Sequence, residues 1–518
     1  AEGTGVPFKL EPMVHKYPLA LAEPTLADPL GDAERLLGAL ELTYALKGVS
    51  IAYPVLLRLP SLLREARWQV TATVWDWGAS EVIDVQPGYV EDSYGIAVDL
   101  GTTTIVAYVT DLNTGEVVAV DSMANPQVAY GADVVSRIYY TMTEKRGAQQ
   151  MRQTIIRGLN RIIGNACARA RLSPQQIAEM TIVGNTAMHH LLLGLETEFM
   201  AKVPFAPALH QSLDLRAGEL GLRINPAANV HILPIEAGFV GADNVAVIIA
   251  TEPYSQEEVT LVIDIGTNGE LVLGNRELGL MACSVAAGPA FEGAHIQCGM
   301  MASRGAIEHL SIDAATYEVE YQVIGGARPQ GICGSGLIDA VAQMLVAGIV
   351  LPSGQINPDI PSPRLRGGQA EVEFVLAWAG EAASGRDIVI TQRDIRQVQL
   401  AKAAFQAGIQ ILMKHMGVDR IDKVLLAGAF GSYIDKALAM TLGLLPDCDL
   451  DRVSVVGNAA GYGARMALVS RSKRAEAIQI ARQVKYLELT ADPGLQPLFL
   501  SSTRFPEPTR DTKAGCAG

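Results

Sequence analysis

Apolar residues along this chain occur in short runs typical of buried strands and in longer helical periods, and one strand–turn–strand pattern appears twice. Residues 94–109, YGIAVDLGTTTIVAYV, run from an apolar strand through Asp99 and a threonine-rich turn into a second apolar strand. Residues 260–273, TLVIDIGTNGELVL, repeat this order around Asp264. Each stretch predicts two strands joined by a tight turn.

The pattern after each turn predicts a similar alternation of strands and helices. In the first round we expect strands at 95–101, 103–111, 115–123, 180–184 and 230–235, and helices near 130–142 and 148–171. In the second we expect strands at 260–266, 269–275, 278–285, 423–431 and 453–457, and a long helix from Thr391 to Met416 that the sequence TQRD would cap. This alternation predicts an α/β protein built from two comparable halves.

The first 92 residues have a different pattern. Residues 1–27 are rich in proline and lack periodicity, which predicts an extended linker. Residues 28–92 predict a small α/β middle domain, with a helix from Asp32 to about Leu46 and two later strands. It contains three of the four tryptophans, Trp68, Trp75 and Trp77, which indicate a compact core. We assign residues 93–518 to a two-lobed domain.

Composition and charge restrict the class of partner. The formal net charge of −14 over 518 residues argues against nucleic acid or an anionic membrane as the main partner. No apolar run approaches the length of about 18 residues that a membrane span needs, and the first residues lack a signal-peptide pattern. We therefore expect a cytoplasmic protein. The six cysteines include no C-x₂-C pair, which indicates buried reduced thiols.

The two Asp-x-Gly-Thr turns predict a phosphate-binding site. Glycine lets a phosphate approach the backbone, and turn amides and threonine hydroxyls donate hydrogen bonds to it. We expect Asp99 and Asp264 to hold Mg²⁺, through water, or to orient the attacking nucleophile. The predicted phosphate contacts are Gly101, Thr102 and Thr103 in the first turn, and Gly266, Thr267, Asn268 and Gly269 in the second. We expect Thr104 to reflect strand propensity. Ordinary surface turns are the alternative interpretation.

A third motif follows a later strand. Residues 424–436, VLLAGAFGSYIDK, run from an apolar strand into Gly428, Ala429, Phe430 and Gly431 and then into a helix. Small residues and open amides at such a position can contact a ligand. A lone G-x-x-G is also common in close-packed turns. After two Asp-x-Gly-Thr turns, we expect these four residues to line the adenosine side of a nucleotide site.

Together the three motifs resemble those of the acetate kinase, sugar kinase, Hsp70 and actin superfamily. Five stretches indicate one family within this superfamily: TIVGNTAMHHLLLG (181–194), CSVAAGPAFEGAHIQCGM (283–300), GICGSGLID (331–339), ITQRDIRQVQLAKAA (390–404) and LAGAFGSYID (426–435). In this order they resemble the ATP-dependent reductive activators of corrinoid proteins. That family restores cobalt(II) to cobalt(I) in methyl-transfer systems such as O-demethylases.

The resemblance carries expectations about fold, cofactors and partners. It implies two RNase H-like halves that bind ATP and Mg²⁺ and a corrinoid protein as partner, with a homodimer as a candidate assembly. Relatives begin with a ferredoxin domain that carries a [2Fe–2S] cluster. The electron donor is expected to act through that domain. No matching cysteine pattern occurs here, and Ala1 falls where the following linker would start. We therefore expect ATPase activity and partner binding from this chain, without direct electron delivery.

Several single residues are weaker candidates. Asn185 is equally well explained as a site residue or as a helix cap, and Glu292 is a candidate catalytic carboxylate near an expected helix start. Small residues around 283–300 could admit a corrin edge, so we expect Ser284, Ala287 and Gly288 to face the corrinoid. We expect His189 and His190 to be packing or surface residues, and Lys402 to lie on a helix surface rather than at the nucleotide.

Three other functions remain open. A small-molecule kinase of the same superfamily would need an acceptor pocket with a base. An activator of a 2-hydroxyacyl-CoA dehydratase would need cysteines for an intersubunit [4Fe–4S] cluster, and Cys283 and Cys333 do not follow that pattern. A non-enzymatic scaffold would show no ATP turnover.

Overall fold

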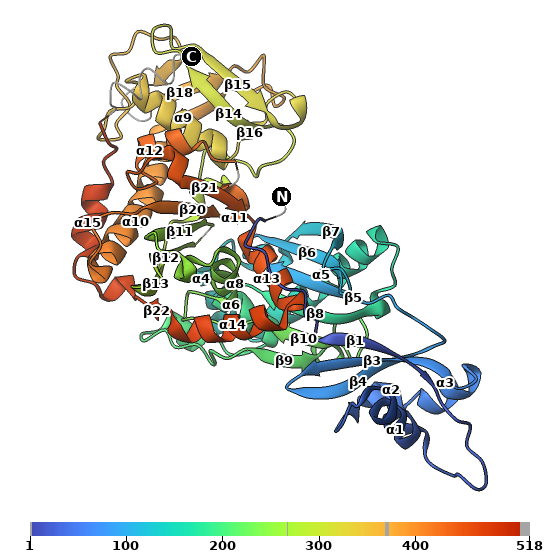
Figure 1. Cartoon of the computed structure of the whole chain (residues 1–518). Coiled ribbons are helices and arrows are strands. Elements are labelled where there is room, and N and C mark those ends of the chain that lie inside the picture. Colours follow the sequence, from blue (N-terminus) through green and yellow to red (C-terminus); the bar gives the residue numbers. More distant parts are fainter. Residues whose placement is uncertain (1–2, 267, 368–371, 432, 508–518) are drawn as a thin grey trace. The chain divides into compact units, whose positions relative to one another are not determined.

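The computed structural model describes residues 3–266, 268–367, 372–431 and 433–507. The chain divides into two units, each described by itself (Figure 1). The N-terminal unit comprises Gly5–Thr251 and Ala459–Arg482. The C-terminal unit comprises mainly Glu252–Asn458 and the described residues after Arg482. Within the described residues, no helix combines the length and the apolar character that crossing a membrane requires.

The N-terminal unit begins with a small α/β domain. Its sheet has the strand order β1-β3-β4-β2. The elements are β1 (Val14–Ala20), α1 (Asp32–Tyr44), β2 (Ser50–Ile51), α2 (Tyr53–Leu56), α3 (Leu59–Glu65), β3 (Gln69–Trp77) and β4 (Ala79–Pro87). Because β1 pairs antiparallel with β3 over its whole length, residues 14–20 belong to this sheet. The expectation of an extended linker over residues 1–27 is therefore wrong for this segment.

The first large sheet follows, with the strand order β7-β6-β5-β8-β10-β9. Its strands are β5 (Tyr94–Leu100), β6 (Thr104–Asp111), β7 (Val117–Ala124), β8 (Ile177–Val183), β9 (Leu213–Arg216) and β10 (Asn229–Ile232). β5, β6 and β7 form the predicted antiparallel meander. β8 lies parallel to β5, and β10 lies parallel to β8.

Helices from distant parts of the sequence complete this unit. They are α4 (Val134–Thr143), α5 (Gly147–Arg169), α6 (Thr186–Leu193), α7 (Ala217–Leu220), α8 (Ala242–Thr251), α13 (Ala459–Val469) and α14 (Arg471–Gln483). α5 packs against β6 and β7, whereas α13 packs against α8, β5 and β8 (Figure 1). The first half of the fold is thus completed by residues that follow the second half in sequence.

A buried polar cluster joins the small domain to the first large sheet and to α14. Glu179 of β8 and Arg474 of α14 are both fully buried, and Arg474 Nη1 donates to Glu179 Oε1 at 2.8 Å. Trp75 Nε1 of β3 donates to the same oxygen at 3.0 Å. Removing one partner of a buried ion pair typically costs about 3–5 kcal/mol, because the remaining charge stays desolvated. Removing Glu179 or Arg474 alone should therefore weaken the attachment of the small domain.

The C-terminal unit repeats the arrangement with the strand order β21-β20-β11-β12-β13-β22. The strands are β11 (Thr260–Ile265), β12 (Gly269–Asn275), β13 (Gly279–Val285), β20 (Lys423–Ala427), β21 (Val453–Gly457) and β22 (Lys485–Tyr486). β11, β12 and β13 form a second meander, and β20 and β21 follow in parallel beside β11. The predicted repeat of the fold is confirmed.

Two further small sheets were not predicted from the sequence. One has the order β15-β14-β16, with β14 (Ala306–Ile312), β15 (Val319–Val323) and β16 (Gly331–Ile332). The other has the order β17-β18-β19, with β17 (Leu365–Gly367), β18 (Val372–Ala377) and β19 (Ile388–Thr391). Their strands are short, and their periodicity is too brief to separate from loops.

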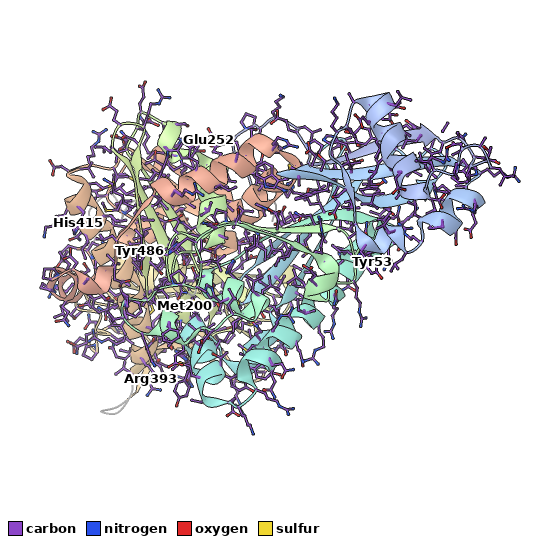
Figure 2. The ribbon with its side chains drawn as sticks, turned by 90° about the horizontal axis from the view of Figure 1, so that it is seen from below. Tyr53, Met200, Glu252, Arg393, His415 and Tyr486 are labelled. Atoms are coloured by element: carbon purple, nitrogen blue, oxygen red, sulfur yellow. The ribbon has the colours of Figure 1, made fainter. Side chains whose placement is uncertain are left out.

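The helices of the C-terminal unit are α9 (Gly334–Val346), α10 (Gln392–Met416), α11 (Gly428–Gly431), α12 (Lys436–Leu442) and α15 (Leu495–Ser502). Thr391 caps α10 as predicted, because its side chain accepts from Asp394 N while the Asp394 carboxylate accepts from Thr391 N. Arg393 and His415 mark the first and last turns of this helix in Figure 2. α10 packs against β12 and β13.

Candidate functional site

The first half-site, defined as Asp99, residues 101–104 and Asn185, lies at the ends of β5 and β8. Asp99 is a partly exposed residue of β5. Leu100 pairs with Ile105, so residues 101–104 form the turn between β5 and β6. Gly101 N donates to Thr104 O at 3.0 Å and closes this turn. The Thr102 amide makes no hydrogen bond to any described residue, so it is a donor available to a phosphate.

Side chains from three other elements hold this turn in place. Asn125 Nδ2 donates to Gly101 O at 2.8 Å, and Arg137 Nη2 of α4 donates to Thr102 O at 2.6 Å. Asn185 Nδ2 donates to Thr102 Oγ1 at 2.8 Å. Thr102 is buried, whereas Thr103 is partly exposed and Thr104 exposed. Asn125 and Arg137 were not predicted, because no local pattern reveals which distant side chains reach the turn.

Asn185 has both of the roles that the sequence left open. Its Oδ1 accepts from Met188 N at 3.0 Å, which caps α6. Its Nδ2 holds Thr102, so the same side chain connects the helix to the turn. A Cβ on Gly241 would lie 2.4 Å from Asn185 Cα, so only glycine allows the start of α8 to pack this closely.

A buried carboxyl group near the first half-site was missed from the sequence. Glu236 follows β10 and is 8% exposed, and its Oε1 accepts from Asn244 Nδ2 at 2.9 Å. Burial raises the pKa of Glu236 to about 8. Thr186 Oγ1 donates to Ala237 O at 2.6 Å, which ties the Glu236 segment to the residue after Asn185. The sequence did contain a signal, since Glu236 directly follows a predicted strand, and Asp99 and Asp264 lie near the ends of two other predicted strands.

The second half-site, defined as Asp264, residues 266–269 and residues 428–431, lies in the C-terminal unit. Ile265 pairs with Gly269, so the chain turns from β11 into β12 between these two residues. Gly428 has a φ of +85°, and a Cβ there would lie 2.5 Å from Asp264 Oδ1. Glycine at 428 therefore brings the end of β20 directly against the Asp264 carboxylate.

Two polar residues lie in the same row of this sheet as Asp264. Asp264 pairs with Glu270 of β12, and Glu270 pairs with Ser284 of β13. Directly paired residues of antiparallel strands point to the same face. Glu270 is 9% exposed, and Ser284 is partly exposed. Glu270 was not among the predicted site residues, because it was assigned only to a strand.

The remaining predicted contacts of the second half-site fall in the turn after β11 and in α11. Thr267 lies outside the described residues. For Ala429 and Phe430 the structure describes the backbone, which forms α11 between Gly428 and Gly431. Asn268 and Gly266 are partly exposed in the turn.

The structure changes the interpretation of the 283–300 segment. Glu292 was expected near a helix start, and it lies in the first and only turn of the short 3₁₀ helix η5 (Pro289–Glu292). Ala287 is 6% exposed and packs in the core of the C-terminal unit with Ala290 and Phe291. Its side chain therefore offers little surface to a corrin. Gly288 is partly exposed.

Three other candidates are structural. Lys402 is 1% exposed, and its Nζ donates to Arg504 O at 2.6 Å, so the expectation of a helix-surface lysine is wrong. Burial lowers the pKa of Lys402 to about 8. His189 and His190 are buried on α6, and His190 Nε2 accepts from Ala208 N at 2.9 Å. The expectation that these histidines pack within the fold is confirmed.

The cysteines in the described part of the chain are free thiols. Cys167, Cys283 and Cys333 are buried, and Cys298 and Cys448 are partly exposed. Burial raises the pKa of Cys167 to about 11, which keeps this thiol protonated. No group of three or more His, Cys, Asp or Glu side chains in the described ranges is arranged to hold a metal ion.

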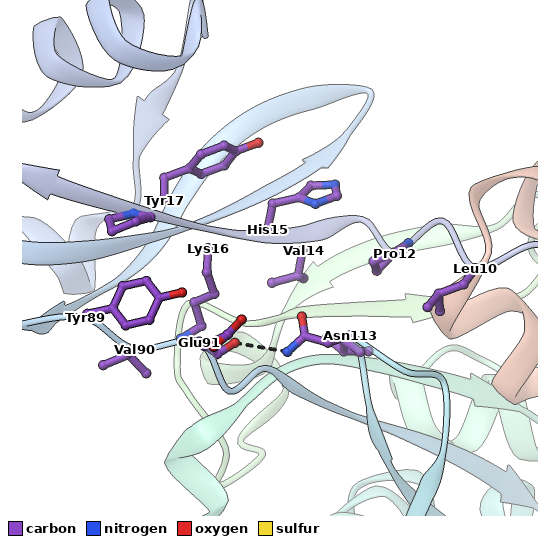
Figure 3. A pocket seen from close by; sticks show the side chains of 12 residues that line it. Leu10, Pro12, Val14, His15, Lys16, Tyr17, Tyr89, Val90, Glu91 and Asn113 are labelled. Atoms are coloured by element: carbon purple, nitrogen blue, oxygen red, sulfur yellow. Dashed lines mark hydrogen bonds between the residues drawn. The ribbon is translucent and has the colours of Figure 1, made fainter.

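A separate hollow lies on the small domain. It has a volume of about 480 Å³ and lies between β1, residues 89–91 and the turn after β6 (Figure 3). Asn113 Nδ2 donates to Glu91 O at 3.0 Å across it. No predicted site residue lines this hollow, so it is distinct from both half-sites.

Each half-site has the groups that a nucleotide phosphate requires. Both present a carboxylate at the end of a buried strand, a glycine-containing turn, and a glycine at the end of the neighbouring parallel strand. A carboxylate beside a phosphate-binding turn is suited to Mg²⁺. The close approach of Gly428 to Asp264 leaves no space for a side chain at the second half-site. The residues therefore fit ATP and its metal.

Comparisons with known proteins agree with this architecture. Family models match the RACo linker region at residues 4–92, the RACo middle region at 94–256, and the C-terminal domain of RACo, the ASKHA domain, at 258–514. These models place a boundary at 92–94, where the small domain was expected to end, and a second at 256–258.

Individual relatives cover most of the chain. The corrinoid activation enzyme RamQ of Eubacterium limosum is 36% identical over 437 residues, which are 82% of this chain and 73% of that protein. The Co(II) methylated amine-specific corrinoid protein reductase of Methanosarcina barkeri is 26% identical over 427 residues, 76% of this chain and 73% of that protein.

A solved structure of a reductive activator for corrinoid, iron-sulfur protein is similar along nearly the whole chain. It has a TM-score of 0.87 and 39% sequence identity, covering 96% of this chain and 80% of that chain. The chain therefore belongs to the RACo family and contains its linker, middle and ASKHA regions in that order.

Proposed function

We infer that this protein is an ATP-dependent reductive activator of a corrinoid protein, in which it restores cobalt(II) to cobalt(I). The observation that carries this conclusion is the 39% identity and TM-score of 0.87 to a reductive activator over 96% of this chain. The two carboxylate-bearing turns supply the chemistry that such an activity needs.

We propose that each half-site contributes residues to the binding of Mg²⁺–ATP. Asp99 and Asp264 would hold the metal through water, and the metal would neutralise charge on the phosphates. The Thr102 amide and the turn around Asn268 would donate to phosphate oxygens. The segment from Gly428 to Gly431 would contact the adenosine. These residues would orient a water molecule for attack on the terminal phosphate, giving ADP and phosphate.

We propose that binding and hydrolysis of ATP change how this protein holds its corrinoid partner. A ligand shifts a conformational equilibrium only by its difference in affinity between two states. The reduction itself adds one electron to cobalt(II), and we propose that a separate low-potential one-electron donor supplies that electron. Ser284 is the candidate hydroxyl that faces the corrinoid, because it is partly exposed in the row of Asp264 and Glu270.

The structure bears on one alternative function. An intersubunit iron–sulfur cluster requires thiols that reach the protein surface. Cys283 is 0% exposed and Cys333 is 2% exposed, so these cysteines are unsuited to a shared cluster. This observation disfavours a cluster held by Cys283 and Cys333, whereas Cys298 and Cys448 are partly exposed.

ATP turnover with and without a cobalamin-loaded corrinoid protein tests the proposal. We expect strong stimulation of ATP hydrolysis by the corrinoid protein, and formation of cobalt(I) when a low-potential reductant is supplied. Asp264→Asn is the control that should abolish both. Stimulation by a sugar or a small carboxylic acid, with transfer of phosphate to it, would instead identify a kinase. Absence of any ATP turnover would identify a scaffold.

A further inference from the structure

Three arginine side chains surround a small hollow on the outer side of the N-terminal unit. Arg157 and Arg161 extend from α5, and Arg223 comes from the segment after α7. The hollow has a volume of about 190 Å³ and is also lined by Asn160. This volume corresponds to about six water molecules at 30 Å³ each, which is sufficient for a phosphate group.

The arginines at this hollow have no acidic partner in direct contact within the described part of the chain. Among the described residues, none of these three guanidinium groups makes an ion pair. The 23-residue helix α5 contains four arginines and no acidic residue. Arg157 and Arg161 are one helical turn apart, where like charges repel each other. Such a cluster is conspicuous in a chain whose net charge is −14.

The third arginine is held beside the helix by specific hydrogen bonds. Asn160 Oδ1 accepts from Arg223 N at 2.7 Å, and Asn160 Nδ2 donates to Gly221 O at 3.0 Å. Arg152 Nη2 donates to Leu220 O at 3.4 Å, which adds a second attachment of this segment to α5. These bonds fix the backbone at Arg223 beside α5, and the Arg157 guanidinium is oriented by donating from Nη2 to Thr154 Oγ1 at 3.2 Å.

We propose that Arg157, Arg161 and Arg223 form a binding site for a phosphate group carried by a small ligand. Guanidinium groups present planar pairs of donors that match phosphate oxygens, and three of them compensate a doubly charged phosphate. This site is separate from the nucleotide turns, because the buried face of α5 packs on β6 and β7 and the arginines lie on its exposed face. Bound phosphate would link α5 to residues 221–223.

Titration with inorganic phosphate tests the site in the full chain. The nucleotide site is first saturated with Mg²⁺ and a non-hydrolysable ATP analogue, and ionic strength is held constant with chloride. We expect wild type to bind about one equivalent by calorimetry or phosphorus NMR. Arg157→Gln with Arg161→Gln should weaken this binding at least tenfold, and Arg157→Lys with Arg161→Lys should weaken it less.

Arg146→Gln is the matched control. Arg146 precedes α5 and is exposed, and it lies roughly three helical turns before Arg157, so the variant removes a charge outside the hollow. Phosphate affinity of Arg146→Gln should stay within twofold of wild type. Absence of phosphate binding to wild type, or an equal loss in Arg146→Gln, would overturn the proposal. Binding of a glutamate-rich peptide but not phosphate would also overturn it and identify a docking surface for an acidic protein.

Discussion

The two half-sites share one topology but hold their turns differently. In the N-terminal unit the turn at residues 101–104 is fixed by side chains of Asn125, Arg137 and Asn185. In the C-terminal unit fewer residues separate the paired positions Ile265 and Gly269, and Gly428 lies directly against Asp264. A polar network therefore holds the first turn, and at the second half-site the end of β20 approaches the carboxylate closely.

The sheet rows next to the two carboxylates differ in one residue. Asp99 pairs with Val106, which pairs with Ser122, whereas Asp264 pairs with Glu270, which pairs with Ser284. The C-terminal row therefore carries a second carboxyl group where the N-terminal row carries valine. The N-terminal unit has its additional carboxyl group at Glu236, after the third parallel strand. The two halves of the repeated fold therefore place their additional carboxyl groups at different positions.

The largest effect is expected from replacing the paired carboxylates. Asp99→Asn and Asp264→Asn should each lower the rate of ATP hydrolysis at least 100-fold, or about 2.7 kcal/mol at 25 °C, because each removes a charge that would hold the metal. Steady-state turnover checks this, with circular dichroism to confirm folding. If one variant stays within threefold of wild type, its half-site is not part of the catalytic centre.

A smaller loss of ATP hydrolysis is expected at Gly428. Two glycine variants separate the effect of its close approach to Asp264 from the effect of backbone strain at a positive φ. Gly428→Ala should lower ATP hydrolysis roughly tenfold, because the new Cβ displaces the Asp264 carboxylate. Gly417→Ala is the matched control, since Gly417 also has a positive φ of 67° but no atom within 4 Å of a new Cβ. Both variants should lose some thermal stability, but only Gly428→Ala should lose activity. Equal activity in the two variants would contradict the role assigned to Gly428.

The polar network of the first turn can be tested at Asn185. Asn185→Ser keeps a capping side chain for α6 but is too short to reach Thr102. We expect the free energy of unfolding to change by less than about 0.5 kcal/mol, while the KM for ATP rises severalfold. Asn185→Ala should additionally lose about 1 kcal/mol of stability through loss of the cap. An unchanged KM in both variants would mean that the turn needs no anchor.

The last prediction concerns the pH dependence of stability and leaves catalysis aside. Burial raises the pKa of Glu236 from 4.5 to about 8, so the folded state binds a proton that the unfolded state releases between these values. Its contribution to stability is therefore present below pH 4.5 and is lost as pH rises towards about 8. Glu236→Gln should flatten the decline in melting temperature over this range. A decline as steep as that of wild type would assign the dependence to other groups.

The sequence by itself determined the repeated part of the fold. Strand-length apolar runs ending in Asp99 and Asp264 recur with the same turn chemistry, and both meanders form as predicted. Thr391 caps α10 for a local reason. The side chains of a threonine and of an aspartate three residues later each accept a hydrogen bond from the backbone amide of the other residue. Such features depend on residues close in sequence, and therefore a local pattern is sufficient to predict them.

Only the tertiary structure decided which distant residues meet. α13 and α14 return to the N-terminal unit, and Arg474 reaches Glu179 across almost 300 positions of the sequence. Asn125, Arg137 and Glu236 gain their roles from packing against other elements, and burial of Ala287 and Lys402 changed what those residues can do. Hydrogen bonding and desolvation depend on neighbours in space, which periodicity along the chain does not specify.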